Sequence, residues 1–538
     1  MAGRMKIVIC LLRNDLRYRD NEVLFWAHKN ATNVIPLYCF DPRHYKGTHQ
    51  FGFPKTGPHR LKFLLESVRD LRTTLQSVGS GLVVRSGNPE DVVPQLIQQF
   101  GEGEVAAVAL QEEATREELD VEAGLHQSCS KLGVQVKKFW GSTLYHREDV
   151  PFSPQGVPNV YTEFRKKVEN RSHVRPPINM PKPLKGLPQG VEEGDIPVFS
   201  SFGLKDPGSD SRTAFPFQGG ETTGLARIED YFWKSDCIAK YKETRNGLIG
   251  SEYSTKFAAW LAHGCVSPRQ IHAEVKRYEK ERTENQSTYW VIFELIWRDY
   301  FKFVALKFGD KMFYLSGLLG VHKPWNKNKQ WFDAWCKGQT GVPFVDANIR
   351  EMAATGFMSN RGRQNVASFL TKDLVLDWRL GAEWFEQMLV DHDVTSNYGN
   401  WLYSAGVGND PRQDRKFNMI KQGLDYDPNG DYIRLWVPEL SGIKGGSIHM
   451  PWTLSSAQLN QAGVSLGETY PSPIVTAPEW SRHSKRPQSG RGGAGGSQGG
   501  GSQGGGRNQS GKGQRRNQGP PRGQQRGLDF YFSNPSQK

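Results

Sequence analysis

The sequence predicts an α/β domain with a parallel sheet, then a long connector, an all-α domain and a disordered tail. Three observations predict this order. Short apolar runs rich in β-branched residues alternate with amphipathic stretches at the start of the chain, and prolines crowd the region that follows. Beyond residue 222 the pattern becomes helical and aromatic, with 13 of the 15 tryptophans. A chain of 538 residues is long enough for two or more domains with cores of their own.

The first domain, residues 1–145, is expected to have a parallel sheet of the nucleotide-fold type. Its five apolar runs are 6–12, 34–40, 82–85, 105–111 and 134–140, and the amphipathic stretches between them are 58–77, 89–100 and 113–132. Strands that alternate with helices predict βαβ units. The glycine pattern at 101–106 precedes a strand instead of following one, so it indicates a turn and not a dinucleotide site.

Residues 146–221 are expected to form an interdomain connector on the surface, because eleven prolines lie between residues 151 and 216 and little periodicity is visible. Residues 222–478 are expected to form the helical domain. From 479 to 538 the chain consists mainly of Gly, Ser, Gln, Asn and Arg. Such a segment cannot bury enough apolar surface to order itself, so we expect a disordered tail.

The positive charge is concentrated at the end of the chain. The formal net charge is +13, and +10 of it belongs to residues 481–538, where eleven Lys and Arg residues stand against the single Asp529. The rest of the chain is near neutral for its size, so a basic face on the folded part must be a local patch. The tail is expected to bind nucleic acid, RNA included, through its charge.

Cysteine spacing and hydropathy indicate an intracellular protein. The six cysteines are scattered without a C-x-x-C pair, as expected for reduced thiols. No apolar run approaches the ~18 residues of a membrane span. The run at 6–12 is too short for a signal peptide and ends at Arg13, and the five residues before it leave no room for a transit peptide. We expect a monomer in the cytoplasm, the nucleus or both, with no membrane contact.

The densest polar stretch is 391–401, which packs two carboxylates, two asparagines and a Trp into eleven residues. A calcium loop needs a Gly after its third oxygen ligand and a late Glu, and both are missing, so we expect no metal. Two interpretations remain open from the residues alone. The stretch can cap a helix N-terminus, or it can line a pocket for a large polar and aromatic ligand.

Several motifs together resemble the photolyase/cryptochrome family over residues 5–475. They are Glu294-Leu-Ile-Trp-Arg298, Asn360-Arg-Gly-Arg363, the stretch 391–401 and Gly264-Cys-Val-Ser-Pro-Arg269. Asn409-Asp-Pro-Arg412 resembles the DASH-type cryptochromes in particular. The resemblance implies an FAD cofactor in the helical domain. It also implies a folate antenna, 5,10-methenyltetrahydrofolate, near Gln111-Glu112-Glu113.

The resemblance assigns FAD contacts to Tyr241, Ser254, Thr255, Lys256, Phe257, Arg298, Asn360, Arg363, Asp391, Asp393 and Asn397. Residues 254–257 would cradle the diphosphate at the start of a helix over 258–262, although Ala258 stands where the family usually has Ser. Arg363 and Asp391 would form a charge pair over the flavin ring, and Asp393 would bind the polar edge of the cofactor. Asn397 would face flavin N5 with an amide, which cannot supply a proton as Asp can.

The resemblance also implies residues for electron transfer and for the substrate. Trp401, Trp378 and Trp325 match in register the family's tryptophan relay between flavin and surface. Glu294 would hydrogen-bond the damaged base, on which Trp297 would stack. The implied substrate contacts are Arg245, Glu294, Trp297, Asn360, Arg361, Gln364, Tyr403 and Arg415. Tyr403 and Gln364 stand where duplex-repair photolyases carry Trp and Met, so this pocket is more polar and stacks more weakly.

The implied activity is light-driven repair of cyclobutane pyrimidine dimers, preferentially in single-stranded DNA, by electron transfer from excited reduced flavin. Two other functions stay open. One is a blue-light photoreceptor with weak or no repair activity. The other is a nucleic-acid-binding protein that acts mainly through its Arg-Gly-containing tail.

Overall fold

A parallel β-sheet forms the centre of the N-terminal domain in the computed structural model, which describes residues 5–410, 412 and 415–483. Its strands are β1 (Met5–Leu12), β2 (Ala31–Phe40), β3 (Val83–Ser86), β4 (Val105–Gln111) and β5 (Gln135–Phe139). They pair in the order β3-β2-β1-β4-β5, and every pair is parallel. The predicted α/β fold is confirmed.

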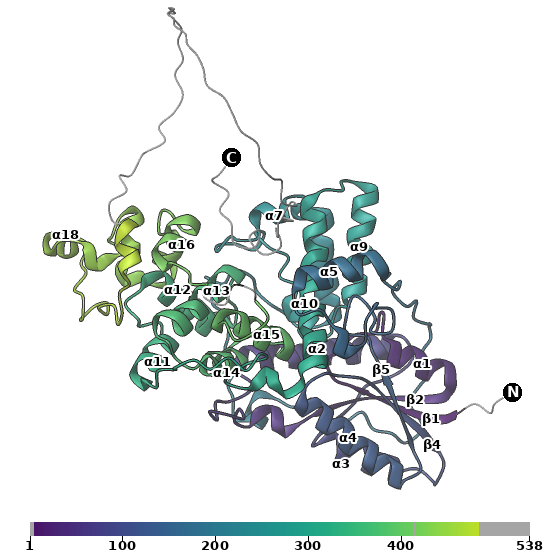
Figure 1. Cartoon of the computed structure of the whole chain (residues 1–538). Helices are drawn as coiled ribbons and strands as arrows, with labels where there is room; N and C mark the ends of the chain where they lie inside the picture. Colours follow the sequence, from purple (N-terminus) through teal and green to yellow (C-terminus); the bar gives the residue numbers. More distant parts are fainter. Residues whose placement is uncertain (1–4, 411, 413–414, 484–538) are drawn as a thin grey trace, which may run out of the picture.

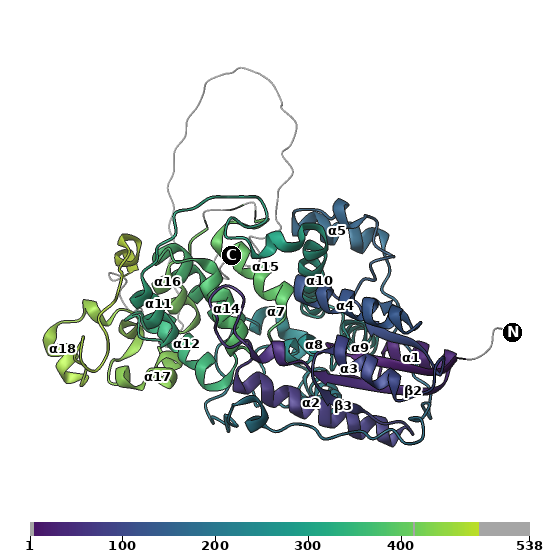
Figure 2. The same ribbon diagram turned by 90° about the horizontal axis from the view of Figure 1, so that it is seen from below.

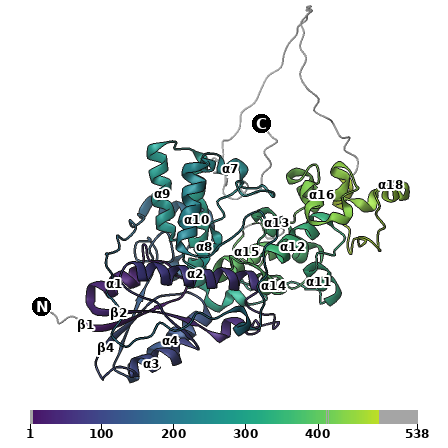
Figure 3. The same ribbon diagram turned by 180° about the vertical axis from the view of Figure 1, so that it is seen from behind.

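Helices cover both faces of this sheet (Figures 1 and 3). On one face lie α1 (Glu22–Asn30) and α2 (Pro58–Ser77), and on the other lie α3 (Pro89–Gln98) and α4 (Arg116–Lys131). Alternate residues of β1 enter the two cores, with Val8 and Cys10 on the first face and Ile7 and Ile9 on the second. Burial on both faces explains why the strand is apolar throughout.

The predicted surface connector, residues 146–221, contains a helix with one buried face, which was not predicted from the sequence. Helix α5 (Tyr161–Arg171) fully buries Tyr161, Phe164 and Val168. Their spacing places the three side chains on one helix face, and the Tyr161 hydroxyl donates to the carbonyl of Phe293 at 2.9 Å. From 172 to 198 the proline-rich chain forms no helix or strand.

The second domain is built from helices. They are α6 (Glu221–Glu229), α7 (Tyr241–Thr244), α8 (Ala258–Ala262), α9 (Pro268–Glu281), α10 (Gln286–Phe308), α11 (Lys329–Cys336), α12 (Pro343–Thr355), α13 (Asn360–Ser368), α14 (Trp378–Met388), α15 (Val394–Ala405), α16 (Met419–Tyr426), α17 (Asp431–Trp436) and α18 (Ser456–Gln461). The helix expected over 258–262 is confirmed as α8. In α10, 16 of the 23 residues are buried, as expected of a helix enclosed by its neighbours. Asn285 and Thr288 form a capping box at its start.

Two buried ion pairs join the domains. Arg269 of α9 donates from Nε and Nη2 to the carboxylate of Asp20 at 3.0 and 2.7 Å. Lys302 of α10 donates to Glu113 at 2.6 Å. One hydrophobic core also extends from β1 and α2 to α10, α14 and α15. Seen from below, α8, α9 and α10 lie beside the sheet domain, with α11, α12, α16 and α18 at the far end (Figure 2).

The first residues of the predicted tail, 479–483, are part of a helix. Residues 479–483 belong to a 3-10 helix (Pro478–His483), and Trp480 is buried, so the prediction of disorder was wrong for this short part. Residues 484–538 lie outside the described part of the chain, and their order and nucleic-acid binding stay predictions. In the part that is described, no helix is both long and apolar enough to cross a membrane.

Candidate functional site

Helix α13 and the loop before α15 meet at an ion pair between a half-buried arginine and a buried aspartate. Arg363 donates from Nη1 to Asp391 Oδ1 at 3.0 Å and from Nη2 to Oδ2 at 2.8 Å, while its Nε donates to the Met358 carbonyl at 2.9 Å. The Asp391 side chain is almost fully buried. A bidentate pair of this kind fixes the plane of the guanidinium as well as its charge. The predicted charge pair is confirmed, and its placement over a flavin ring stays a prediction.

Asp393 caps helix α15, which follows that ion pair. Its Oδ1 accepts bonds from the Ser396 backbone N–H and the Thr395 hydroxyl, both at 2.8 Å, and Arg298 lies 3.6 Å from its Oδ2. Burial alone would raise its pKa, but the charges of Arg298 and Lys302, together with these bonds, hold the pKa of Asp393 well below its usual range. The helix-cap interpretation of 391–401 is thus confirmed, and the carboxylate stays ionised.

Asn397 lies one turn into α15, with its amide held in one orientation. Its Nδ2 donates to the Ala382 carbonyl at 2.9 Å, and the side chain is half-buried. One N–H and the amide oxygen remain for a ligand. An amide can donate or accept a hydrogen bond but has no proton to transfer at neutral pH. This is the property expected of a residue that faces flavin N5.

The predicted diphosphate cradle, residues 254–257, holds a strained and buried lysine. Lys256 has φ +63°, which residues other than glycine rarely adopt. Its Nζ lies 3.1 Å from the centre of the Tyr253 ring and 4.7 Å from that of Phe357, and no hydrogen-bond partner is found for it among the described residues. Burial lowers the pKa of Lys256 well below its usual value. A buried amine without an acceptor is costly, so this group fits a site completed by an anion such as the FAD diphosphate.

Glu294 and Arg245 form an ion pair at the predicted substrate site. Arg245 Nη1 donates to Glu294 Oε1 at 2.7 Å. The Glu294 side chain is 32% exposed and that of Arg245 only 5%. The guanidinium of Arg245 is buried and turned towards a carboxylate, and its contact with phosphates or bases stays a prediction. Its place in the structure is to orient Glu294.

Trp297 is already stacked on one side. The Tyr161 ring of α5 lies parallel to it, with ring centres 3.6 Å apart and planes at 8°. Tyr403 meets Trp297 edge-on, at 5.8 Å and 82°. Tyr161 covers one face of the indole and Trp297 is only 8% exposed, so stacking of a base on this ring stays a prediction. Sequence reasoning missed Tyr161, whose only signal is its helical spacing with Phe164 and Val168.

Arg361 and Gln364, both predicted at the substrate, are bound to each other. Arg361 donates to Gln364 Oε1 at 3.1 Å and to Asn246 Oδ1 at 3.0 Å. Burial lowers the pKa of Arg361 to about 10. The Arg361 side chain lies inside the protein, and its contact with phosphates or bases stays a prediction. Asn360 is exposed and Arg415 half-buried, and their substrate contacts stay predictions.

The three predicted relay tryptophans differ in exposure in the expected order. Trp401 and Trp378 are buried, and Trp325 is half-buried. Trp378 Nε1 donates to the Leu315 carbonyl at 3.2 Å. The residue after Trp325 donates its N–H to the Val375 carbonyl at 2.7 Å, so the loop of Trp325 lies against the loop that leads into Trp378. The relay itself stays a prediction.

A close helix contact seats Trp401 and gives a prediction for stability. A Cβ added to Gly381 of α14 would lie 2.1 Å from Cη2 of Trp401. Gly381→Ala must therefore push α14 and α15 apart, and we expect the free energy of unfolding to fall by about 1–3 kcal/mol, measured by urea unfolding. Gly156→Ala is the control, because its nearest atom would be 3.4 Å away. An equal loss in both variants would argue against the packing explanation.

The predicted folate residues lie where β1 and β4 meet, at the switch point of the sheet. Ligands of parallel α/β sheets commonly bind outside the carboxyl ends of the strands there. The carboxylates are already paired: Glu113 accepts from Lys302 at 2.6 Å, and Glu112 pairs with Arg147 at 2.6 Å. Gln111 Nε2 donates to Glu113 at 3.4 Å. A folate would have to bind beside these pairs, and its presence stays a prediction.

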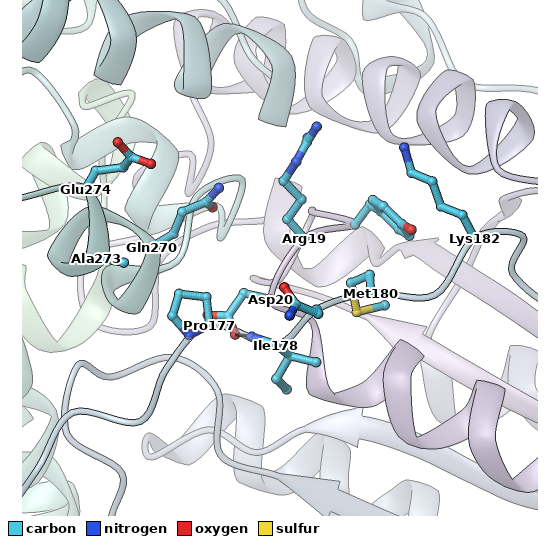
Figure 4. A pocket seen from close by; sticks show the side chains of 11 residues that line it. Arg19, Asp20, Pro177, Ile178, Met180, Lys182, Gln270, Ala273 and Glu274 are labelled. Atoms are coloured by element: carbon cyan, nitrogen blue, oxygen red, sulfur yellow. Dashed lines mark hydrogen bonds between the residues drawn. The ribbon is translucent and has the colours of Figure 1, made fainter. Parts of the chain in front are cut away.

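A cavity of about 340 Å³ lies where the loop after β1, the connector and α9 meet (Figure 4). Arg19 and Lys182 point to the same side of it, and Gln270 and Glu274 approach from α9. None of the predicted site residues lines this cavity. Across the described ranges, no group of three His, Cys, Asp or Glu residues could hold a metal ion.

Known proteins share both the sequence and the domain order. A family model described as DNA photolyase matches residues 8–183, and one described as the FAD binding domain of DNA photolyase matches residues 290–487. The chain is 62% identical to Cryptochrome DASH of Xenopus laevis over 534 residues, which covers 99% of each chain. It is 61% identical to Cryptochrome DASH of Danio rerio over 533 residues, which covers 98% of each.

Solved structures show the same fold. A cryptochrome from Synechocystis has a TM-score of 0.84 at 50% identity, covering 88% of this chain and 98% of that one. A class III photolyase from Agrobacterium tumefaciens has a TM-score of 0.77 at 28% identity, covering 90% and 97%. The chain therefore belongs to the photolyase/cryptochrome family, among its DASH-type cryptochromes, and carries the FAD-binding domain of that family.

Proposed function

We propose that this protein repairs cyclobutane pyrimidine dimers with light and prefers dimers in single-stranded DNA. Membership of the family supports a photolyase or cryptochrome function with FAD as cofactor. The observation that carries the finer proposal is the Trp297 ring. Tyr161 covers one of its faces, Tyr403 lies edge-on, and the Glu294–Arg245 pair begins one turn earlier on the same helix. These contacts fix the plane of the indole next to the carboxylate that would bind the base.

The residues of this chain would bind and tune the cofactor. When bound, FAD supplies a light-excited electron donor. Lys256 and the loop 254–257 would receive the diphosphate. Arg363, fixed by Asp391, keeps a positive charge in the site, and Asn397 offers a hydrogen bond without a proton. A fixed positive charge favours an electron-rich cofactor. A folate antenna beside the β1–β4 switch point belongs to the same proposal.

At the substrate, stacking and hydrogen bonding have separate residues. Trp297 would stack on the dimer, and Glu294, oriented by Arg245, would accept hydrogen bonds from base N–H groups. Flipping a dimer out of a duplex needs a few kcal/mol for unstacking and unpairing. Because Tyr403 meets Trp297 edge-on, it adds less stacking than a second parallel indole would. A dimer in a single strand is already unpaired, so no free energy is spent on flipping it out of a duplex. We therefore expect dimers in single strands to be repaired faster.

Repair of one dimer in a single-stranded oligonucleotide tests this proposal. Under blue light with a reductant, the wild type is expected to restore both pyrimidines. Trp297→Ala should slow repair at least ~tenfold, since stacking on an aromatic side chain is worth roughly 1–3 kcal/mol per base. Tyr161→Phe is the control, because it keeps the covering ring and removes only the hydroxyl. Repair that is absent in light, or equally fast in the dark, would refute the proposal.

A further inference from the structure

An exposed apolar patch surrounds the loops of Trp378 and Trp325. Seven large apolar side chains are exposed in the described part of the chain, and four of them lie here: Tyr314 (53%), Leu315 (37%), Leu319 (50%) and Val375 (39%). We call these four residues the relay patch. They belong together because Trp378 binds the Leu315 carbonyl and the loop of Trp325 binds the Val375 carbonyl. Clustered apolar exposure marks interaction surfaces on soluble proteins.

The Val375 side chain is exposed, and its backbone has a conformation that β-branched residues rarely adopt. Its φ is +54°, which is an outlier for a β-branched residue. Its neighbours Leu374 and Leu376 are fully buried, and their N–H groups donate to the carbonyls of Phe369 and Leu370 at 2.9 and 3.0 Å. The buried neighbours fix the strained residue between them, so its side chain must face solvent. Strain of this kind persists mainly where function uses it.

Lysines outnumber acidic residues in the segment that carries Tyr314, Leu315 and Leu319. Residues 311–332 contain Lys311, Lys323, Lys327 and Lys329 and no Asp or Glu. Lys323 donates to the carbonyl of Ala405 at 2.8 Å. The other three are exposed, and within the described ranges none of them forms an ion pair. Two acids flank this segment: Asp310 pairs with Arg116, and Asp333 lies four residues after Lys329 on α11. Near Val375, Asp377 pairs with Arg379. A partner that fits this surface would have an apolar centre and an acidic rim.

We infer that the relay patch docks an acidic protein that donates single electrons, an inference that rests on the proposed function. With FAD bound and excited by light, Trp401 would give one electron to the flavin, and the vacancy would move through Trp378 to Trp325. The docked donor then gives one electron to the Trp325 radical cation. The indole returns to its neutral form, and the donor is oxidised by one electron. No proton has to cross the interface.

The composition of the patch favours a protein over a nucleic-acid strand. Interfaces with nucleic acid are polar and strongly charged, whereas the four side chains of the relay patch are apolar or aromatic. The lysines act at the rim, where opposite charge speeds encounter and weakens with salt. Trp325 lies between Lys323 and Lys327 in the chain, so a partner guided by these charges would arrive next to the predicted end of the relay.

A flash-photolysis experiment on the full chain tests the inference. The probes are two ferrous haem proteins, acidic cytochrome b5 and basic cytochrome c, whose oxidation is read from the haem absorbance after a blue flash. Cytochrome b5 is expected to be oxidised at least ~tenfold faster than cytochrome c at low salt, and this advantage should shrink at high salt. The double variant K327E/K329E should reduce the rate with cytochrome b5 about tenfold, and Leu319→Ser should also slow it.

Controls separate the docking surface from the relay. K166E/K280E reverses two exposed lysines on α5 and α9 and should leave every rate unchanged. Dithiothreitol, a small neutral donor, should act equally on the wild type and on K327E/K329E. If Trp325→Phe leaves the electron-donation rates of both cytochrome b5 and dithiothreitol unchanged, Trp325 does not belong to an electron relay and the inference is overturned. If Trp325→Phe stops both donors but K327E/K329E leaves cytochrome b5 unaffected, the docking inference alone is overturned. It is also overturned if saturating single-stranded DNA stops the oxidation of cytochrome b5, because the relay patch would then bind nucleic acid.

Discussion

Trp401→Phe is expected to abolish most of the light-driven reduction of the bound flavin. Trp401 is buried one turn after Asn397 on α15, so it is the relay ring nearest to the predicted flavin site. Electron loss must begin at that ring, and a phenyl ring is much harder to oxidise than an indole. The measurement is bleaching of the flavin absorbance under blue light with a thiol. Trp378→Phe should have a similar effect, because it interrupts the next step.

A neighbouring tryptophan provides the matched control. Trp335 is also fully buried and lies edge-on to Trp401, with ring centres 6.4 Å apart. Trp335→Phe removes the same volume from the same core but lies outside the predicted relay, so it should retain photoreduction. Undiminished bleaching in both Trp401→Phe and Trp378→Phe would remove the relay from the account.

Tyr403→Trp combined with Gln364→Met is expected to bring repair of duplex DNA towards that of single strands. In the wild type, repair of a single-stranded dimer should be at least ~tenfold faster, a ratio that corresponds to about 1.4 kcal/mol. Flipping a dimer out of a duplex costs a few kcal/mol. Because Tyr403 lies edge-on to Trp297, its stacking energy offsets little of that cost. A second indole and an apolar neighbour would supply more. The assay compares one dimer in single-stranded, looped and fully paired DNA under saturating light.

Single replacements show which property of the pocket matters. Tyr403→Phe keeps the ring size and removes the hydroxyl, so it tests polarity alone. Gln364→Met removes the oxygen that accepts a bond from Arg361 at 3.1 Å, so it tests that contact alone. If stacking decides, neither single variant should restore duplex repair as the double variant does. Equal rates on all three substrates in the wild type would defeat the stacking argument.

The sequence could predict elements and pairings that follow from local pattern. β-branched runs and their spacing predicted the parallel sheet, and the short apolar stretch at 258–262 is a helix. The Arg363–Asp391 pair could be predicted from the resemblance of the 360–363 and 391–401 motifs to the photolyase/cryptochrome family. These features depend on residue type and spacing, which the sequence states directly.

Burial and long-range contacts could not be predicted in the same way. Arg245 and Arg361 read as surface cations, yet both are enclosed by their neighbours in the fold. Lys256 stands beside two hydroxyl residues, yet its amine turns inward between two aromatic rings. Tyr161 stacks on Trp297 because α5, which precedes the proline-rich residues 172–198, packs on α10. The contacts Arg245–Glu294, Lys256–Phe357 and Tyr161–Trp297 join parts far apart in the chain, so no local window contains their cause.

The most direct test of the central claim is the number of dimers repaired per protein molecule. A single-stranded oligonucleotide with one dimer, in large excess, is incubated with the full chain and a reductant under constant blue light. The account predicts steady repair through many turnovers that stops when the light is switched off. No repair, or a single light-induced change in flavin absorbance without restored pyrimidines, would contradict it and favour a light sensor.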